Sequence, residues 1–192
     1  MIKLSLQSIR QLLVWTVLAG VIYPVAVTLV SQAAFKSQAN GSILVEGTNQ
    51  VGSSLLAQQF TGSNYFWPRP SAATYATVAS GASNLGPTSG ALKTNVQTKL
   101  DDLRAAHSLK ADATVPAELV FTSGSGLDPD ITPEGALFQV KRIATSRKVQ
   151  PERLTELVQR LVQPRQFGVF GEDRVNVLSL NLTLDREFGA GK

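Results

Sequence analysis

The sequence predicts an α+β protein, in which a single N-terminal transmembrane helix precedes one soluble domain of about three helices on a small sheet. An uncharged apolar run of 25 residues lies between Arg10 and Lys36, and about 20 such residues cross a bilayer. Amphipathic helical periodicity recurs in the soluble part, and an alternating Leu pattern near the C-terminus is typical of a strand. With 43% hydrophobic residues, the soluble part is long enough to bury a core.

The apolar run divides the chain into three parts. We expect a cytoplasmic tail, a transmembrane helix and a periplasmic-side α+β domain at residues 1–10, 11–35 and 36–192. Lys3 and Arg10 precede the run with no acidic residue beside them, and basic flanks stay in the cytoplasm. These features predict a single-pass membrane protein, with the N-terminus inside and the domain outside.

A cleaved signal peptide is the alternative to a retained anchor. The residues Ser31-Gln32-Ala33 resemble a cleavage site. The apolar region of a signal peptide spans about 7 to 15 residues, whereas this run is longer and carries Tyr23 and Pro24 in its middle. The length therefore favours the anchor.

Composition excludes several kinds of function. Lys3 and Arg10 belong to the tail, which leaves 16 of the 18 basic residues against 14 acidic ones in the remainder. This near balance argues against nucleic-acid binding. The chain has no cysteine and one histidine, His107, so thiolate metal sites and disulfides are excluded.

Small and polar residues recur every four positions in the apolar run. The stripe consists of Thr16, Gly20, Pro24 and Thr28 and continues to Gln32. Such residues let helices approach closely in lipid, so we expect a partner helix and a kink at Pro24. A lone anchor is the alternative, because a four-residue spacing drifts around a helix of 3.6 residues per turn.

The first half of the soluble part combines a hairpin, a long loop and a helix. Residues 42–45 and the segment from Val51 flank the turn-like residues 46–49, which predicts a hairpin. The small and polar stretch 71–90 is typical of a long loop. The next helix is predicted by an apolar face with a cap at Thr88 or Ser89; that face consists of Leu92, Val96, Leu100 and Leu103.

The second half is predicted to contain two helices and a strand. Thr132 followed by Pro133 begins one helix, and Pro151 begins the other. The second of these helices has the clearest amphipathic pattern, formed by Leu154, Leu157, Val158, Leu161 and Val162. Leu178, Leu180, Leu182 and Leu184 alternate with polar residues, which predicts a half-buried strand.

The residues that could carry chemistry do not form a catalytic pattern. Ser125 lies in Gly124-Ser125-Gly126, which is not the Gly-x-Ser-x-Gly of a nucleophile elbow, and His107 follows a helix end. Asp128 and Asp130 lack the regular ligand series of a calcium loop. No Gly-Lys-Ser/Thr follows the glycines. We therefore predict no catalytic residue, no metal site and no cofactor bound by this chain alone.

A run of cations follows residue 140. Its members are Lys141, Arg142, Arg147, Lys148, Arg153, Arg160 and Arg165. A solvated face of two helices is the simpler interpretation. Contact with anionic lipid heads or with an acidic partner is the alternative.

Four segments carry a family resemblance. They read NYFWPRPSA at 64–72, SGASNLGPTS at 80–89, SGSGLDPDITP at 123–133 and GEDRVNVLSLNLTLD at 171–185. Together, in this order and after one N-terminal span, they resemble the C subunit of the Kdp potassium-transporting P-type ATPase. The resemblance covers nearly the whole chain.

This resemblance implies an accessory subunit of a high-affinity potassium uptake complex that is not itself an enzyme, and it implies location in a bacterial cell (inner) membrane. The implied partners are a potassium-path subunit, an ATP-hydrolysing subunit, a small stabilising subunit and membrane lipid. The implied roles are assembly of the complex and a catalytic chaperone effect that raises the ATP affinity of the hydrolysing subunit. ATP binds on the cytoplasmic side of the membrane. A domain on the outside would therefore affect ATP binding only indirectly, through the neighbouring subunits.

We expect the docking surface to lie on an aromatic segment and a nearby loop. Aromatic residues and Arg dominate interface energetics, and the candidates are Tyr65, Phe66, Trp67, Arg69, Asn84 and Leu85. For Phe66 and Trp67 the alternative is a place in the core of the domain. An independent, membrane-anchored periplasmic binding or enzymatic module is the alternative function.

Overall fold

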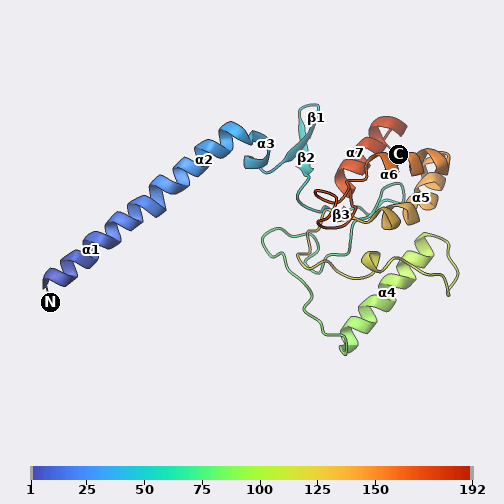
Figure 1. Ribbon diagram of the computed structural model, residues 1–192. Helices are drawn as coiled ribbons and strands as arrows, with labels where there is room; N and C mark the ends of the chain where they lie inside the picture. The colour runs from blue at the N-terminus through green and yellow to red at the C-terminus, as the bar shows by residue number, and fades with distance from the viewer. Residues whose placement is uncertain (1, 191–192) are drawn as a thin grey trace. The chain divides into compact units, whose positions relative to one another are not determined.

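The computed structural model describes residues 2–190. They fall into two compact units that divide between Val51 and Gly52. A long apolar helix is followed by a mixed domain of helices and two two-stranded sheets, which confirms the predicted α+β class (Figure 1).

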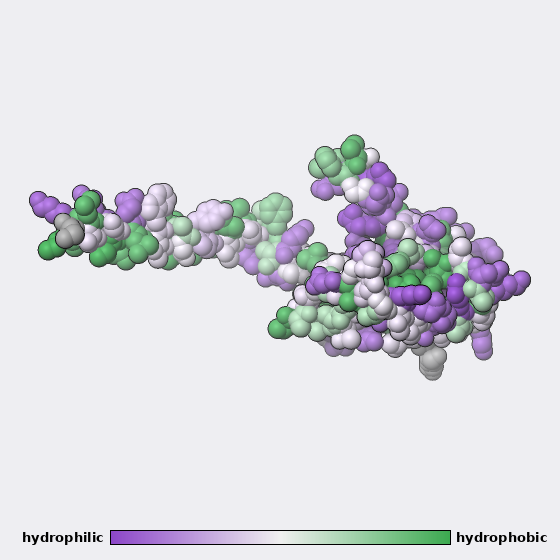
Figure 2. All heavy atoms as spheres, turned by 90° about the horizontal axis from the view of Figure 1, so that it is seen from below, coloured by the Kyte–Doolittle hydropathy of each residue, from purple (hydrophilic) through white to green (hydrophobic). Residues whose placement is uncertain are grey.

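The first unit is dominated by one helix of 33 residues, Ile2–Ala34, which is long and apolar enough to cross a membrane. It consists of α1 (Ile2–Val17), a π-helical segment (Leu18–Ile22) and α2 (Tyr23–Ala34), and the short α3 (Lys36–Ala39) follows. In Figure 2, apolar residues recur along the exposed surface of this helix. The helix starts at Ile2, well before the predicted span of 11–35.

Pro24 affects this helix through the π-helical segment that precedes it. Proline has no backbone N–H and leaves a carbonyl one turn earlier without its usual donor. The backbone widens at this point, where the Tyr23 N–H donates to the carbonyl of Leu18, five residues back. Such bulges are a known way to absorb a break in the hydrogen-bond ladder.

The predicted hairpin follows the helix. Strand β1 (Ile43–Glu46) pairs with β2 (Asn49–Ser53). The turn includes Gly47, whose φ of 60° suits glycine, because a side chain is strained there. The hairpin prediction is confirmed.

The second unit contains four helices of ten residues or more, one more than predicted. They are α4 (Gly90–Ala106), α5 (Pro133–Arg147), α6 (Pro151–Arg160) and α7 (Val177–Phe188). A 3₁₀ turn (Ala117–Leu119) and the strands β3 (Asp130–Ile131) and β4 (Val175–Asn176) complete it. The two strands are antiparallel, with Ile131 opposite Val175. Residues 54–89 form turns and loops; the loop predicted at 71–90 is confirmed except for Gly90, which begins α4.

The helix starts follow the predicted capping residues. The Ser89 hydroxyl accepts a hydrogen bond from the N–H of Leu92 at the start of α4. The Thr132 hydroxyl does the same for Gly135 at the start of α5. Each cap satisfies one of the N–H groups that a first helical turn leaves unpaired.

The strand predicted at 178–184 is wrong, because this segment lies within α7. The Asn176 side chain caps the helix by accepting from the N–H of Ser179. Val177, Leu180 and Leu184, spaced by three and four residues, are buried against the core. Within the alternating pattern, Leu180 and Leu184 are four residues apart and share one helical face with Val177, and leucine prefers helix.

The core of the second unit lies among α5, α6 and α7, with Phe66 at 0% exposure inside it. Ile143 from α5, Leu154 from α6 and Leu180 from α7 are also fully buried there. The irregular segment that carries Phe66 is thus held by the helices, although it has no strand partner of its own.

Candidate partner-docking site

Two buried side-chain amides hold the aromatic segment in place. Asn181 accepts from the Phe66 N–H at 2.8 Å and donates to the Phe66 carbonyl at 2.9 Å. Gln139 accepts from the Trp67 N–H at 2.8 Å and donates to the Trp67 carbonyl at 3.0 Å. The amides of α7 and α5 thereby replace neighbouring strands, since buried backbone groups must find partners.

Arg142 lies buried behind Trp67, with its guanidinium carbon 3.9 Å from the centre of the indole ring. All five of its N–H groups find neutral acceptors. The acceptors are Nε2 of His107 (3.2 Å), the carbonyls of Gly62 (3.5 Å), Ser63 (2.6 Å) and Tyr65 (3.0 Å), and Oε1 of Gln139 (2.8 Å). Burial lowers the pKa of Arg142 to about 10. The stacked cation and its hydrogen bonds fix the orientation of Trp67.

His107 completes the layer behind Trp67. Its ring stands perpendicular to the indole at a centroid distance of 6.2 Å and lies 4.5 Å from the ring of Phe138. Burial, and then the charge of Arg142, lower its pKa to about 4. The imidazole is therefore neutral near pH 7, and its Nε2 accepts a hydrogen bond.

Tyr65 is anchored to the other end of α5 and to α7. Its hydroxyl donates to Asp185 at 2.9 Å. Arg147 pairs with the same carboxylate at 2.7 Å and lies 4.9 Å from the Tyr65 ring centre. Burial, and then the hydrogen bond to Asp185, raise the pKa of Tyr65.

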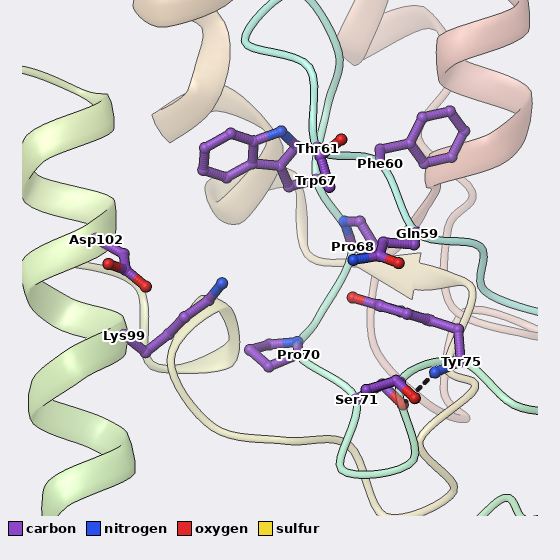
Figure 3. A pocket seen from close by; sticks show the side chains of 11 residues that line it. Gln59, Phe60, Thr61, Trp67, Pro68, Pro70, Ser71, Tyr75, Lys99 and Asp102 are labelled. Atoms are coloured by element: carbon purple, nitrogen blue, oxygen red, sulfur yellow. Dashed lines mark hydrogen bonds between the residues drawn. The ribbon is translucent and has the colours of Figure 1, made fainter.

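In front of this supported segment lies an open pocket of about 370 Å³. Figure 3 shows Trp67, Pro68 and Pro70 on one wall, with Lys99 and Asp102 of α4 facing them. The volume and the mixture of apolar wall and few polar groups suit a small ligand or the side chains of an inserted loop.

Tyr75 closes another side of the pocket on a strained turn. Thr74 and Tyr75 have positive φ angles of 50° and 60°, which bulky residues rarely adopt. The Ser71 hydroxyl accepts from the Tyr75 N–H at 2.9 Å, and the Tyr75 hydroxyl donates to the Arg69 carbonyl at 3.0 Å. Burial raises the pKa of Tyr75 to about 12. Strain of this kind clusters at functional sites.

The predicted docking residues separate in the structure. Trp67 lines the pocket, whereas Phe66 fills the core and takes the alternative role foreseen for it. Arg69 pairs with Asp128 at 2.8 Å beside a different hollow. Asn84 is exposed and Leu85 half-buried in the long loop, outside the lining of the Trp67 pocket.

The run of seven cations is not one solvated face. Arg142 is buried, and the Arg147 side chain is only 2% exposed. Arg160 pairs with Glu187, and Arg165 with Glu172. The two buried arginines support the aromatic segment instead.

The serine and histidine weighed for catalysis have other partners. The Ser125 hydroxyl accepts from the N–H of Leu127, while His107 is held by Arg142. Within residues 2–190, no group of three or more His, Cys, Asp or Glu side chains could hold a metal ion.

Gln139 and Asn181 are the supporting residues that sequence analysis missed. Each is a neutral amide within an otherwise apolar helix face, and both are almost completely buried. A buried amide requires hydrogen-bond partners. An amide within an apolar helix face is therefore the sequence feature that could have identified these two residues.

Comparison with known proteins gives consistent matches. The family described as "K+-transporting ATPase, c chain" (KdpC) matches residues 5–186. A potassium-transporting ATPase KdpC subunit from Myxococcus xanthus is 49% identical, over 98% of this chain and 90% of its own length. Counterparts from Paraburkholderia phytofirmans (47%; 90% and 91%) and Herpetosiphon aurantiacus (43%; 93% and 94%) are similar over nearly the same extent.

Proposed function

Because the chain belongs to the KdpC family of K+-transporting ATPase c chains, we propose that it acts as a docking and coupling subunit of that complex. It is a non-catalytic subunit whose partners are other Kdp subunits. The finer proposal is that it is needed for assembly and raises the ATP affinity of the hydrolysing subunit.

The observation that carries the docking proposal is the pocket at Trp67. Its aromatic wall is fixed from behind by Arg142 and Gln139, so it is shaped before any partner arrives. Preorganised aromatic surfaces bind with little loss of conformational entropy. We propose that the potassium-path subunit inserts a loop here and also contacts Tyr65, Arg69, Asn84 and Leu85, which lie outside the pocket lining.

Substitution of pocket residues tests this proposal. Trp67→Ala and Lys99→Ala should each reduce co-purification with the potassium-path subunit from mild detergent and lower potassium uptake. Lys99 is a half-buried residue of α4 outside the hydrophobic core, so its replacement separates loss of docking from loss of folding. Phe121→Ala, at a 45% exposed aromatic outside the pocket, is the matched control. Normal co-purification of both folded pocket variants would refute the docking site.

The membrane helix is proposed to anchor the chain, with the domain outside. The basic residues before the apolar run support this orientation, and the match to the family, which begins at residue 5, covers most of the helix. External protease added to spheroplasts should digest the domain, whereas protection would place it in the cytoplasm.

Failure of the wild-type chain to co-purify with any other subunit would favour the alternative function, an independent periplasmic module.

A further inference from the structure

The loop between α6 and β4, Gln163–Arg174, forms a small closed hairpin. Two bridges hold it together, Gln163 with Arg174 and Gln166 with Phe170. In each pair both N–H groups donate to the opposite carbonyl, at distances of 2.8–3.0 Å. We call this segment the 163–174 loop; none of its residues lines the pocket at Trp67.

The tip of the 163–174 loop exposes three large apolar side chains. Phe167 is 85% exposed, Val169 71% and Phe170 65%. Phe167 and Gly168 both have positive φ angles, of 55° and 73°. A phenylalanine held in this conformation is strained, and the bridges hold it there. The backbone thus presents the apolar tip in one defined shape, and exposed clusters of this kind mark interaction sites.

The charged residues at the base of the tip are already paired. Arg165 lies 2.8 Å from Glu172, and Arg174 lies 3.1 Å from Asp130. The Asp173 carboxylate accepts from the Arg165 N–H at 3.1 Å. Surfaces that bind anionic lipid carry an excess of basic residues around their apolar part. This loop has two basic and two acidic residues, so its charge favours an uncharged recess in a protein.

The small area of the tip also limits the kind of contact that it can form. Three such side chains cover a few hundred Å², whereas a stable interface buries about 1,200 Å² or more. The tip is therefore too small to form a dimer of this chain alone. It suffices as one anchor point in a chain that its membrane helix already holds nearby, because tethering supplies a high effective concentration.

We infer that the 163–174 loop inserts Phe167, Val169 and Phe170 into an apolar recess on another subunit of the same complex. This contact is additional to the pocket at Trp67, and it rests on the proposed assembly of the chain into that complex. Because the bridges fix the backbone of the tip before docking, binding does not have to order the loop itself.

Site-specific photo-crosslinking in the intact complex tests the inference. A photoreactive residue replaces Val169 in the full-length chain, and one at Phe121, which is 45% exposed and outside the pocket at Trp67, serves as the control. Irradiation of membranes should crosslink position 169 to another subunit of the complex, identified by mass spectrometry, with no such product from position 121. Crosslinking of position 169 to lipid, to a second copy of this chain or to nothing would overturn the inference.

Two substitutions measure the strength of the contact. Phe167→Ser combined with Phe170→Ser should lower the fraction of chain retained on the detergent-purified complex by about ten-fold, while the melting temperature of the free chain stays unchanged because both side chains are exposed. Phe121→Ser, outside both contact sites, should leave retention unchanged. Undiminished retention of the double variant contradicts the inference; failure of the wild-type chain to co-purify contradicts the proposed function instead.

Discussion

At the scale of single residues, the site depends on a cation buried among neutral partners. A buried charge is costly unless every donor is satisfied, and Arg142 meets this condition through carbonyls, an amide and an imidazole. The planar guanidinium of arginine donates hydrogen bonds to several acceptors in fixed directions, whereas lysine has a single ammonium group. The cost of burial is offset by holding Trp67 in one orientation.

His107 makes the stability of this layer depend on pH. Its pKa is about 4 in the folded chain and 6.5 in the unfolded chain, so only the unfolded chain takes up a proton as pH falls from 6.5 towards 4. Stability is complete above pH 6.5 and decreases through this window, by about 2 kcal/mol at pH 5. Thermal unfolding of the detergent-solubilised chain at pH 7.5 and pH 5 measures the loss.

His107→Gln is the control for this prediction. A glutamine oxygen can still accept from Arg142 but does not titrate, so the variant should lose less stability than the wild type over the same window. Equal losses in both proteins would show that His107 is not the group responsible.

The two buried amides should differ in what they contribute. Gln139→Leu leaves both backbone groups of Trp67 and one N–H of Arg142 without partners, and each such buried group costs about 1–3 kcal/mol. We expect a loss of roughly 3 kcal/mol or more, together with a weaker near-ultraviolet tryptophan signal. Asn181→Leu removes only two bonds and should cost less.

An exposed glutamine on the neighbouring helix provides the reference for these variants. Gln159→Leu on α6 should change stability by about 0.5 kcal/mol at most. If Gln139→Leu were as mild as this change, the amide would not be what holds Trp67 in place.

At the scale of elements, the sequence predicted those features that local chemistry determines. Ser89 and Thr132 cap their helices as expected, because a cap depends on residues within one turn. The helix at 177–188 was not predicted, since the alternation of leucines indicated a strand and masked the helical spacing of Val177, Leu180 and Leu184. Its cap, Asn176, is a local signal that argues for the helix.

The support of the aromatic segment could not be predicted in the same way. Gln139 contacts Trp67 across 72 residues of sequence, and Asn181 contacts Phe66 across 115. The chain shows only that two amides interrupt apolar helix faces. Which backbone groups they satisfy depends on how the helices pack, and the burial of Phe66 follows from the same packing.

The membrane helix offers a prediction of its own. Beyond a methyl group of Thr16 at 4.0 Å, an added Cβ at Gly20 meets no other atom of the structure described. Gly20→Ile should therefore leave the helix intact but prevent a partner helix from approaching closely. We expect about a ten-fold loss of co-purification, corresponding to roughly 1.4 kcal/mol.

Ala19→Ile is the matched control, because Ala19 is adjacent but lies outside the stripe of Thr16, Gly20, Pro24 and Thr28. It adds similar bulk to the same helix. Equal effects of the two substitutions would mean that the stripe does not define a packing face.

At the scale of the whole molecule, the proposed topology requires the ATP effect to be indirect. A domain outside the membrane cannot contact nucleotide in the cytoplasm, so its influence must pass through the membrane helix and the neighbouring subunits. Such coupling is typically worth 1–3 kcal/mol, which is about 5- to 150-fold in affinity. Coupling in binding free energy is reciprocal, and this gives the proposal a sharp test.

If this chain tightens ATP binding by the hydrolysing subunit, ATP must tighten binding of this chain by the same factor. We expect a non-hydrolysable ATP analogue to slow dissociation of the chain from the detergent-solubilised complex by about five-fold or more, and Gly20→Ile to weaken ATP binding by the complex. The purified chain alone should show no melting shift with the analogue. A shift in the isolated chain would instead indicate direct nucleotide contact and would contradict both the indirect coupling and the outward orientation.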